Sequence, residues 1–178
     1  MAVIEAIATT YMEADAASVA FTGIPQTYKH LQLRISSRDT SDADTVEVAI
    51  RFGPVGDVVD TGASYYSQEI RGYQTTESGS TNGPQTSIKC SFSTGTNIDM
   101  AGYGCGMVNL LDYRNTNKMM TYLATGGQPM NATGYSWISQ VGGLWNGEAA
   151  VDKITIGGAG FSDDLVRGTV ITIYGLNV

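Results

Sequence analysis

The chain has 178 residues, a length typical of one compact domain. Only 15% of the residues are charged and 22 are glycine, but 42% are hydrophobic, so the low charge does not indicate disorder. The formal net charge of −7 argues against nucleic-acid binding, because contacts to phosphates need a surplus of Lys and Arg. A domain of this size buries enough surface to fold without a disulfide or a metal ion.

Residues 1–17 are predicted to form an N-terminal arm or hairpin in front of a single β-sandwich domain of residues 18–178. A helix is the alternative, since four apolar residues have helical spacing: Val3, Ile4, Ile7 and Tyr11. The β-favouring residues 9–11, followed by a possible turn at residues 13–17, indicate a hairpin instead. The segment has no Lys or Arg and no uninterrupted apolar core, so a secretory signal peptide is not expected.

Period-two alternation of apolar and polar residues predicts strands along the rest of the chain. It is clearest at residues 30–35, 45–52, 153–156 and 170–174. Further β-rich segments are residues 18–21, 65–73, 87–92, 106–113, 118–124 and 135–141. Turn-forming clusters separate them at residues 41–44, 53–54, 126–127 and 157–158, and residues 75–86 are predicted to form a long surface loop.

About ten short strands separated by turns, with little support for helix, predict an all-β protein. The expected fold is an antiparallel β-sandwich of the jelly-roll type.

Four segments, read together in chain order, resemble small jelly-roll virion proteins encoded by tailed bacteriophages, including cyanophages and other marine phages. The segments are residues 18–38, 111–118, 143–156 and 173–176, and they span almost the whole chain. The resemblance implies a structural protein of the particle. It would be either a capsid decoration (cement) protein or a component of a tail appendage.

The residues whose side chains could take part in catalysis or metal binding form no recognisable pattern. His30 is the single histidine and lies on the polar face of its strand, so a Ser-His-Asp or Cys-His arrangement would depend on it. Cys90 and Cys105 fit no zinc spacing; they could pair in an oxidising compartment, but two neutral buried thiols are favoured. We therefore predict no enzyme, no catalytic residue, no cofactor and no metal ligand.

Two acidic clusters could bind calcium weakly, because calcium prefers oxygen ligands on loops. They are Asp39 with Asp42 and Asp44, and the pair Asp163–Asp164. The EF-hand pattern is absent, and solvated acidic turns are the favoured interpretation. A glycosidase pair would also need a sugar cleft and one carboxyl with a raised pKa, and nothing singles out such a pair.

Aromatic residues suggest a second class of function, because aromatic rings stack on sugars and jelly rolls often serve as lectins. Tyr65, Tyr66 and Tyr73 are the candidates for carbohydrate contact, although core and interface packing is favoured. Residues 144–145 and Tyr174 are expected in the core. The glycines at residues 102–106 lead into a strand and lack a following Lys-Ser/Thr, so they indicate a bulge or turn and not a phosphate site.

The leading hypothesis is a non-enzymatic phage virion protein that decorates the outer capsid and cements neighbouring major capsid proteins. The expected state is a homotrimer made in the host cytoplasm, without nucleic-acid or membrane partners. Residues before Phe21 and the segment 75–86 are the expected contact surfaces, since a β-rich terminus can add to a neighbour's sheet edge. The alternative is a tail-fibre or appendage module that recognises host surface glycans.

Overall fold

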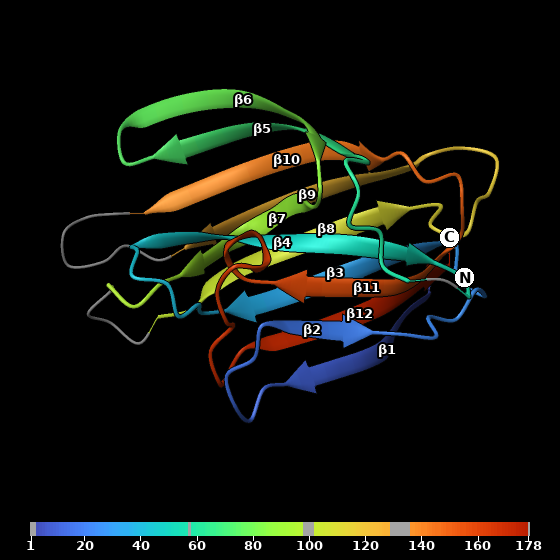
Figure 1. Ribbon diagram of the computed structural model, residues 1–178, viewed down its shortest axis with the longest axis horizontal. Coiled ribbons are helices and arrows are strands. Elements are labelled where there is room, and N and C mark those ends of the chain that lie inside the picture. The colour runs from blue at the N-terminus through green and yellow to red at the C-terminus, as the bar shows by residue number, and fades with distance from the viewer. Residues whose placement is uncertain (1–2, 57, 98–101, 129–135, 178) are drawn as a thin grey trace.

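The computed structural model describes residues 3–56, 58–97, 102–128 and 136–177, and they form a sandwich of two antiparallel sheets (Figure 1). The large sheet has the strand order β1-β12-β3-β8-β9-β10-β5-β6 and the small sheet the order β2-β11-β4-β7. The predicted all-β sandwich is confirmed, while its assignment as a jelly roll stays a prediction.

The strand bounds follow the alternation in the sequence. The large sheet consists of β1 (Val3–Tyr11), β12 (Val170–Asn177), β3 (His30–Ser37), β8 (Gly104–Leu111), β9 (Met120–Gln128), β10 (Trp137–Trp145), β5 (Tyr65–Tyr73) and β6 (Thr76–Gln85). The small sheet consists of β2 (Ser18–Phe21), β11 (Val151–Gly157), β4 (Thr45–Pro54) and β7 (Ile88–Thr94). A single 3-10 turn, η1 (Ala159–Phe161), is the one helical element among the described residues.

The core lies between the two sheets where the apolar faces of their strands meet. Leu31, Leu33 and Ile35 of β3 face Ile154 and Ile156 of β11 across a cluster of buried hydrophobic residues. These are the residues that the alternation assigns to one face of each strand. Burial of this cluster is the main source of the stability of the fold.

The structure contradicts the predicted N-terminal hairpin and the predicted loop at residues 75–86. β1 pairs with β12 and β2 pairs with β11, so residues 3–11 form a strand but no hairpin with residues 18–21. Whether residues 1–17 act as a separate arm stays a prediction. Residues 76–85 form the edge strand β6, paired with β5, where the sequence predicts a loop. Its Gly, Ser, Thr and Asn residues are poor strand formers, and the pairing with β5 outweighs this weak propensity.

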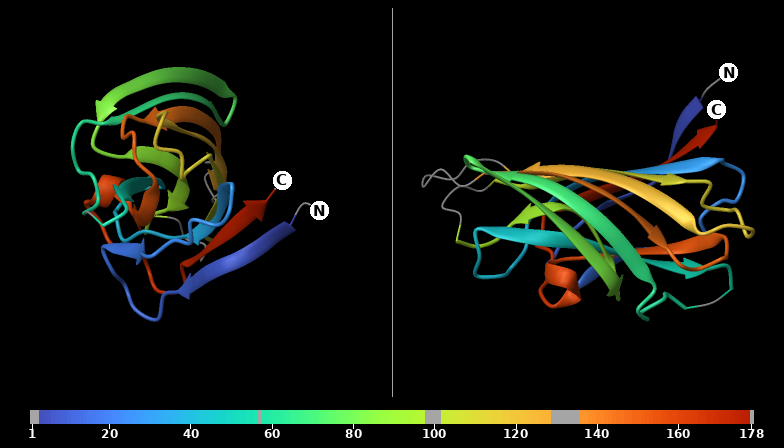
Figure 2. Two further views of the ribbon diagram at one scale, coloured as in Figure 1. Left: turned by 90° about the vertical axis from the view of Figure 1, so that its right-hand side faces the viewer. Right: turned by 90° about the horizontal axis from the view of Figure 1, so that it is seen from above.

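The large sheet is wider than the small one and curls around it. Figure 2 shows β5 and β6 arching over the edge of the small sheet, and the free ends of β1 and β12 projecting from the body of the sandwich. Among the described residues, no strand or helix packs against the other face of the large sheet.

Candidate functional site

The uncovered face of the large sheet is uncharged across four neighbouring strands. The pairing of β8 with β9, β9 with β10 and β10 with β5 aligns the outward residues in four rows of four. We call this surface the uncharged face; it comprises Cys105, Met107, Asn109, Leu111, Thr121, Leu123, Thr125, Gly127, Ile138, Gln140, Gly142, Leu144, Tyr66, Gln68, Ile70 and Gly72. None of them is charged, and Ile138 and Ile70 are 69% and 66% exposed.

A shallow hollow of about 790 Å³ lies on this face, next to Met107 and Ile138. Glycines in β8 and β9 explain it. A Cβ atom on Gly126 would lie 2.8 Å from Cβ of Ser91 in β7, and one on Gly106 would overlap the same serine. The large sheet can approach β7 this closely only because these positions lack side chains, and the hollow lies opposite that approach.

The edges of the large sheet differ in how they are protected. β6 carries Glu77, several glycines and Pro84, which discourage pairing with another chain. β1 is nine residues long, has neither Pro nor Lys, and exposes Val3, Ile4 and Tyr11. A bulge at Ile7 and the charge of Glu5 protect β1 only in part. β1 is therefore an available edge for pairing with another strand.

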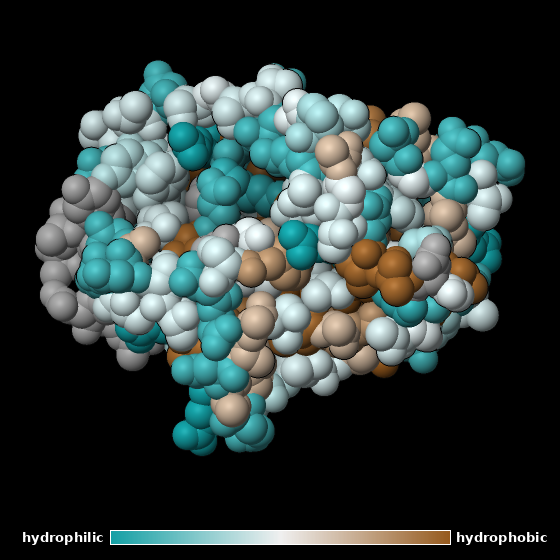
Figure 3. Space-filling model, in the orientation of Figure 1, coloured by the Kyte–Doolittle hydropathy of each residue, from teal (hydrophilic) through white to brown (hydrophobic). Residues whose placement is uncertain are grey.

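A polar cleft of about 580 Å³ opens between the sheets, with β6 on one side and β4 and β7 on the other. Figure 3 shows hydrophilic residues around this hollow, below β6. Lys89 lines the cleft and forms ion pairs with Glu47 and with Glu69, whose Oε2 lies 2.8 Å from the ammonium. Glu69 is 1% exposed and is not one of the lining residues, so a nearly fully buried carboxylate lies behind Lys89.

His30 lies where the sequence places it, partly exposed on the outer side of β3. Its Nδ1 accepts a hydrogen bond of 2.9 Å from the backbone N–H of Asp112. The hydrogen bond from Lys118 and the positive charge of this lysine lower the pKa of Asp112. This group ties the loop after β8 to β3, since the imidazole accepts from the backbone of Asp112 and lies 3.5 Å from its carboxylate.

Only one of the two cysteines is buried as predicted. Cys90 is buried, its thiol donates to the carbonyl of Val48, and burial raises its pKa strongly. Cys105 is exposed on the uncharged face, so the prediction of two buried thiols is wrong for this residue. Outward alternation along β8 is the cause. Both cysteines are free thiols.

Of the first acidic cluster, Asp39 lies near the second cluster and is not part of a solvated turn, while Asp42 is exposed and Asp44 half-buried. Asp39 is fully buried, and the carboxylates of Asp163 and Asp164 act on it electrostatically. Burial raises the pKa of Asp39 despite the hydrogen bond from the N–H of Ser41, and its Oδ2 has no hydrogen-bond partner. Within the described ranges, no group of three or more acidic, His or Cys residues is arranged to hold a metal ion.

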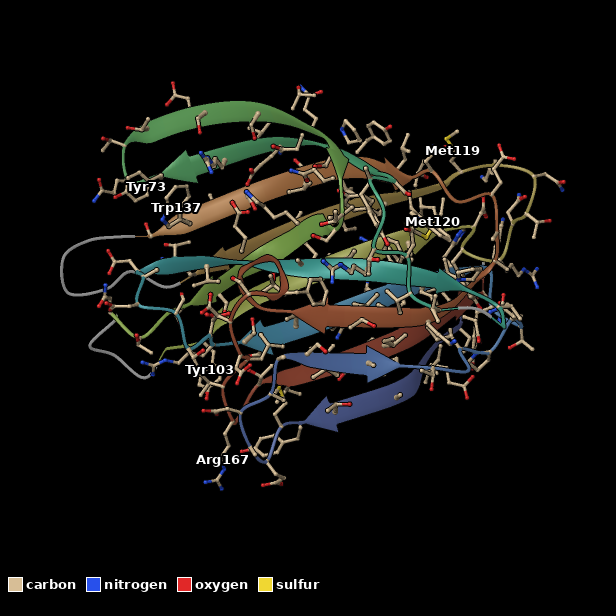
Figure 4. All side chains as sticks on the ribbon, in the orientation of Figure 1. Tyr73, Tyr103, Met119, Met120, Trp137 and Arg167 are labelled. Carbon is tan, nitrogen blue, oxygen red and sulfur yellow. The ribbon has the colours of Figure 1, made fainter. Side chains whose placement is uncertain are left out.

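The aromatic candidates separate into core and surface. Tyr65 is fully buried; its hydroxyl donates to the carbonyl of Asp60 at 2.8 Å and accepts from the N–H of Phe52 at 3.0 Å. Tyr66 belongs to the uncharged face. Tyr73 stacks on Trp137 with ring centroids 4.3 Å apart at one end of the large sheet (Figure 4).

Trp145 is in the core as predicted, and its indole N–H donates to Asp60 at 2.8 Å. Tyr174 is not: it is half-buried on the outer side of β12, with the Arg34 guanidinium 4.7 Å from the ring centroid. Leu144 is likewise half-buried and belongs to the uncharged face. The predicted bulge or turn at residues 102–106 is in part wrong, because Gly104 and Gly106 lie inside β8.

The residues that sequence reasoning missed are those of the uncharged face and the cleft. In β5, Ser67 and Glu69 are buried while Tyr66 and Ile70 are exposed. This is the reverse of the usual alternation of apolar residues inside and polar residues outside, and it becomes visible only once the burial of the strand is known.

No family model, curated protein or solved structure matches this chain. In the part of the chain that the structure describes, no helix has the length and apolar character needed to span a membrane.

Proposed function

We propose that this chain is a non-enzymatic phage virion protein that decorates the outer capsid and cements neighbouring major capsid proteins. The observation that carries the proposal is the uncharged face, which presents four rows of uncharged residues from β5, β10, β9 and β8. Protein interfaces are depleted of charge at their centres, because an unpaired charge is costly to bury.

The distribution of charge supports an interface on this face. The chain has 17 acidic and 10 basic residues, and all of them lie outside the uncharged face. A sheet surface with exposed Ile70, Leu123 and Ile138 offers apolar area to a partner. The acidic remainder suits a position on the outside of a shell, away from packaged DNA.

The edge of β1 supplies a second contact in this proposal. An incoming strand from a neighbouring subunit would pair with β1 and extend the eight-stranded sheet. Several such contacts in a homotrimer would act together, and linked weak contacts raise the overall affinity by about 10²–10⁴. The segment 76–85, expected to be a contact loop, is a protected edge and contributes less.

The strand order supports the jelly-roll part of the proposal. β2-β11-β4-β7 lie opposite β3, β5 and β6, so the chain crosses between the sheets at every step from β2 to β7 except at the β5–β6 hairpin. We interpret the β8–β9–β10 meander as an expansion of one jelly-roll strand, with β1 and β12 added beside β3. This interpretation also explains why the large sheet is twice as wide as the small one.

A density map of the intact particle, together with the copy number from quantitative mass spectrometry, tests the proposal. We expect hundreds of copies on the shell, with the uncharged face directed to the capsid. A handful of copies at the tail would overturn the cement role and would favour the alternative, a tail-fibre or appendage module that recognises host glycans.

A further inference from the structure

A second, smaller hollow of about 410 Å³ lies between the connection of β2 to β3 and the loop that joins β8 to β9. Its volume is within the usual range of about 300–1,000 Å³ for ligand pockets. The hollow is lined by Lys29, Asp112, Arg114, Asn115, Thr116 and Asn117. All six side chains are polar or charged, so an apolar group would only remove water from them.

Two side-chain hydrogen bonds hold the loop against the segment that precedes β3. The hydroxyl of the buried Tyr113 donates to the carbonyl of Pro25. Nη1 of Arg114 donates to the carbonyl of Gln26 at 3.0 Å. The guanidinium of Arg114 is therefore held at the hollow before any ligand binds, which reduces the entropy that binding would cost.

Cations outnumber carboxylates in this hollow. The carboxylate of Asp112 forms an ion pair with Lys118. Lys29 and Arg114 are exposed, and no carboxylate of the described residues forms an ion pair with either of them. The hydrogen bond from Lys118 lowers the pKa of Asp112 and the charge of Lys29 adds to this effect, so a negative charge is favoured at this place. Two cations remain uncompensated in a chain whose net charge is −7.

The uncharged lining residues can bind hydroxyl groups beside these cations. The backbone N–H of Asn117 donates to Oδ1 of Asn115 at 2.8 Å, which leaves the amide nitrogen of Asn115 to donate to a ligand. Thr116 and Asn117 are exposed at the same turn. A ligand with one oxyanion and several hydroxyls would use both the cations and these groups. An acidic peptide would use the cations, but the hollow has no apolar lining for its other side chains.

We propose that this hollow binds the oxyanion of an acidic sugar. The carboxylate, sulfate or phosphate group would lie between Lys29 and Arg114, and the ring hydroxyls would contact Asn115 and Thr116. None of the six lining residues belongs to the uncharged face. The inference therefore goes beyond the assembly role and does not depend on it.

The test is an NMR titration of the isotope-labelled full chain at low ionic strength with glucuronic acid, glucose-6-sulfate and glucose-6-phosphate. Methyl glucoside is the neutral arm, and an acetylated tetra-aspartate peptide is the peptide arm. We expect millimolar binding of at least one acidic sugar, with amide shifts centred on residues 112–117, and weaker binding in the other two arms. Added salt should weaken the binding, because exposed charges are screened.

Lys29→Gln and Arg114→Gln each remove one uncompensated cation, and the double variant K29Q/R114Q should bind about tenfold more weakly. Arg167→Gln is the matched control, because Arg167 is an exposed arginine well away from Met119 at the end of this loop (Figure 4). The control should bind like the unaltered chain. Arg114→Gln also loses the bond to Gln26, so thermal unfolding must show that it is folded. Lys29→Gln breaks no side-chain hydrogen bond or ion pair among the described residues, so it tests the site by itself.

The proposal fails if no acidic sugar gives a saturable shift, if methyl glucoside binds as tightly as the acids, or if K29Q/R114Q binds like the unaltered chain. Tighter binding of the peptide than of every acidic sugar would assign the hollow to an acidic protein segment, and it would also overturn the proposal.

Discussion

Placing one carboxylate on the uncharged face should separate assembly from folding. Ile138 is 69% exposed in the isolated chain and lies next to the hollow on this face. Because the side chain is already in water, Ile138→Asp should lower the free energy of unfolding only by the β-propensity difference, about 1 kcal/mol or less. Thermal unfolding of the isolated protein measures this change.

Attachment to the shell should respond far more strongly. If this face is desolvated against capsid protein, the new carboxylate is buried without a partner, which costs about 3–5 kcal/mol. At about 1.4 kcal/mol for each factor of ten, the affinity should fall by about 10²–10³. The charge must be an Asp, since a Lys could carry its ammonium to the rim on a flexible stem.

The assay is binding of purified chain to shells assembled without it, followed by sedimentation. Val55→Asp is the matched control, because Val55 is a β-branched residue that is 59% exposed and lies outside both the uncharged face and residues 1–21. We expect the control to bind like the unaltered protein and Ile138→Asp to remain in the supernatant. Equal binding of Ile138→Asp and the unaltered chain would refute the assignment of this face as the interface.

Three further predictions concern β1, Tyr65 and Asp39. Deleting residues 1–11 should release the protein from particles while the sandwich still folds. The deletion stops before Met12 because that side chain is in the core. Particles that retain the shortened protein would exclude β1 as a contact. Tyr65→Phe leaves the buried N–H of Phe52 without its acceptor and should cost about 1–3 kcal/mol in denaturant unfolding; an unchanged midpoint would contradict this account. Because burial raises the pKa of Asp39, the folded state binds this proton more tightly than the unfolded state, so stability from this group is present at low pH and is lost as pH rises through the raised pKa. The difference in unfolding temperature between Asp39→Asn and the unaltered chain should therefore shift in favour of the variant as the pH is raised from about 3 to about 7. A difference that does not change with pH would show that the carboxylate does not titrate as inferred.

The sequence predicts the core strands well because the apolar residues of their alternation are the ones that are buried. In β3, Leu31, Leu33 and Ile35 alternate with polar residues and are all buried. The same holds for Val48, Ile50 and Phe52 of β4. In these strands one face meets the other sheet, so the pattern in the sequence and the packing agree.

The misses occur where the contacts come from distant parts of the chain. β6 has almost no hydrophobic residue and is a strand because it pairs with β5. Gly126 and Gly127 were predicted to form a turn but lie within β9, where Gly126 allows β7 to approach. Neither effect is encoded in the local pattern, since each depends on which strand becomes a neighbour.

The candidate surfaces could not be located from the sequence for the same reason. The uncharged face forms only when four strands pair in a fixed register. Residues such as Thr125 and Gln140 give no sign in the sequence that they belong to it. Tyr174 was expected in the core because it is aromatic, but alternation along β12 places it outside with Arg34. For Tyr174, the aromatic residue type predicts the inner side of the sheet, whereas the alternation along β12 places it on the outer side.

The uncharged face depends on the reversed alternation of β5 and of the first half of β10. In β5, Glu69 faces the small sheet and Ile70 faces outward; in β10, Ser139 is buried and Ile138 is exposed. Moving either strand by one residue would exchange these sets, but it would also turn Tyr65 of β5, or Val141 and Trp145 of β10, out of the core. The pairing of Gln140 with Ile70 and of Ser139 with Arg71 fixes the register against this exchange. Because a strand residue can face only one side, the polar residues buried on the inner side of these strands require the uncharged residues on the outward side. A change of register would therefore alter both sides together, whereas a single substitution such as Ile138→Asp changes the outward face alone.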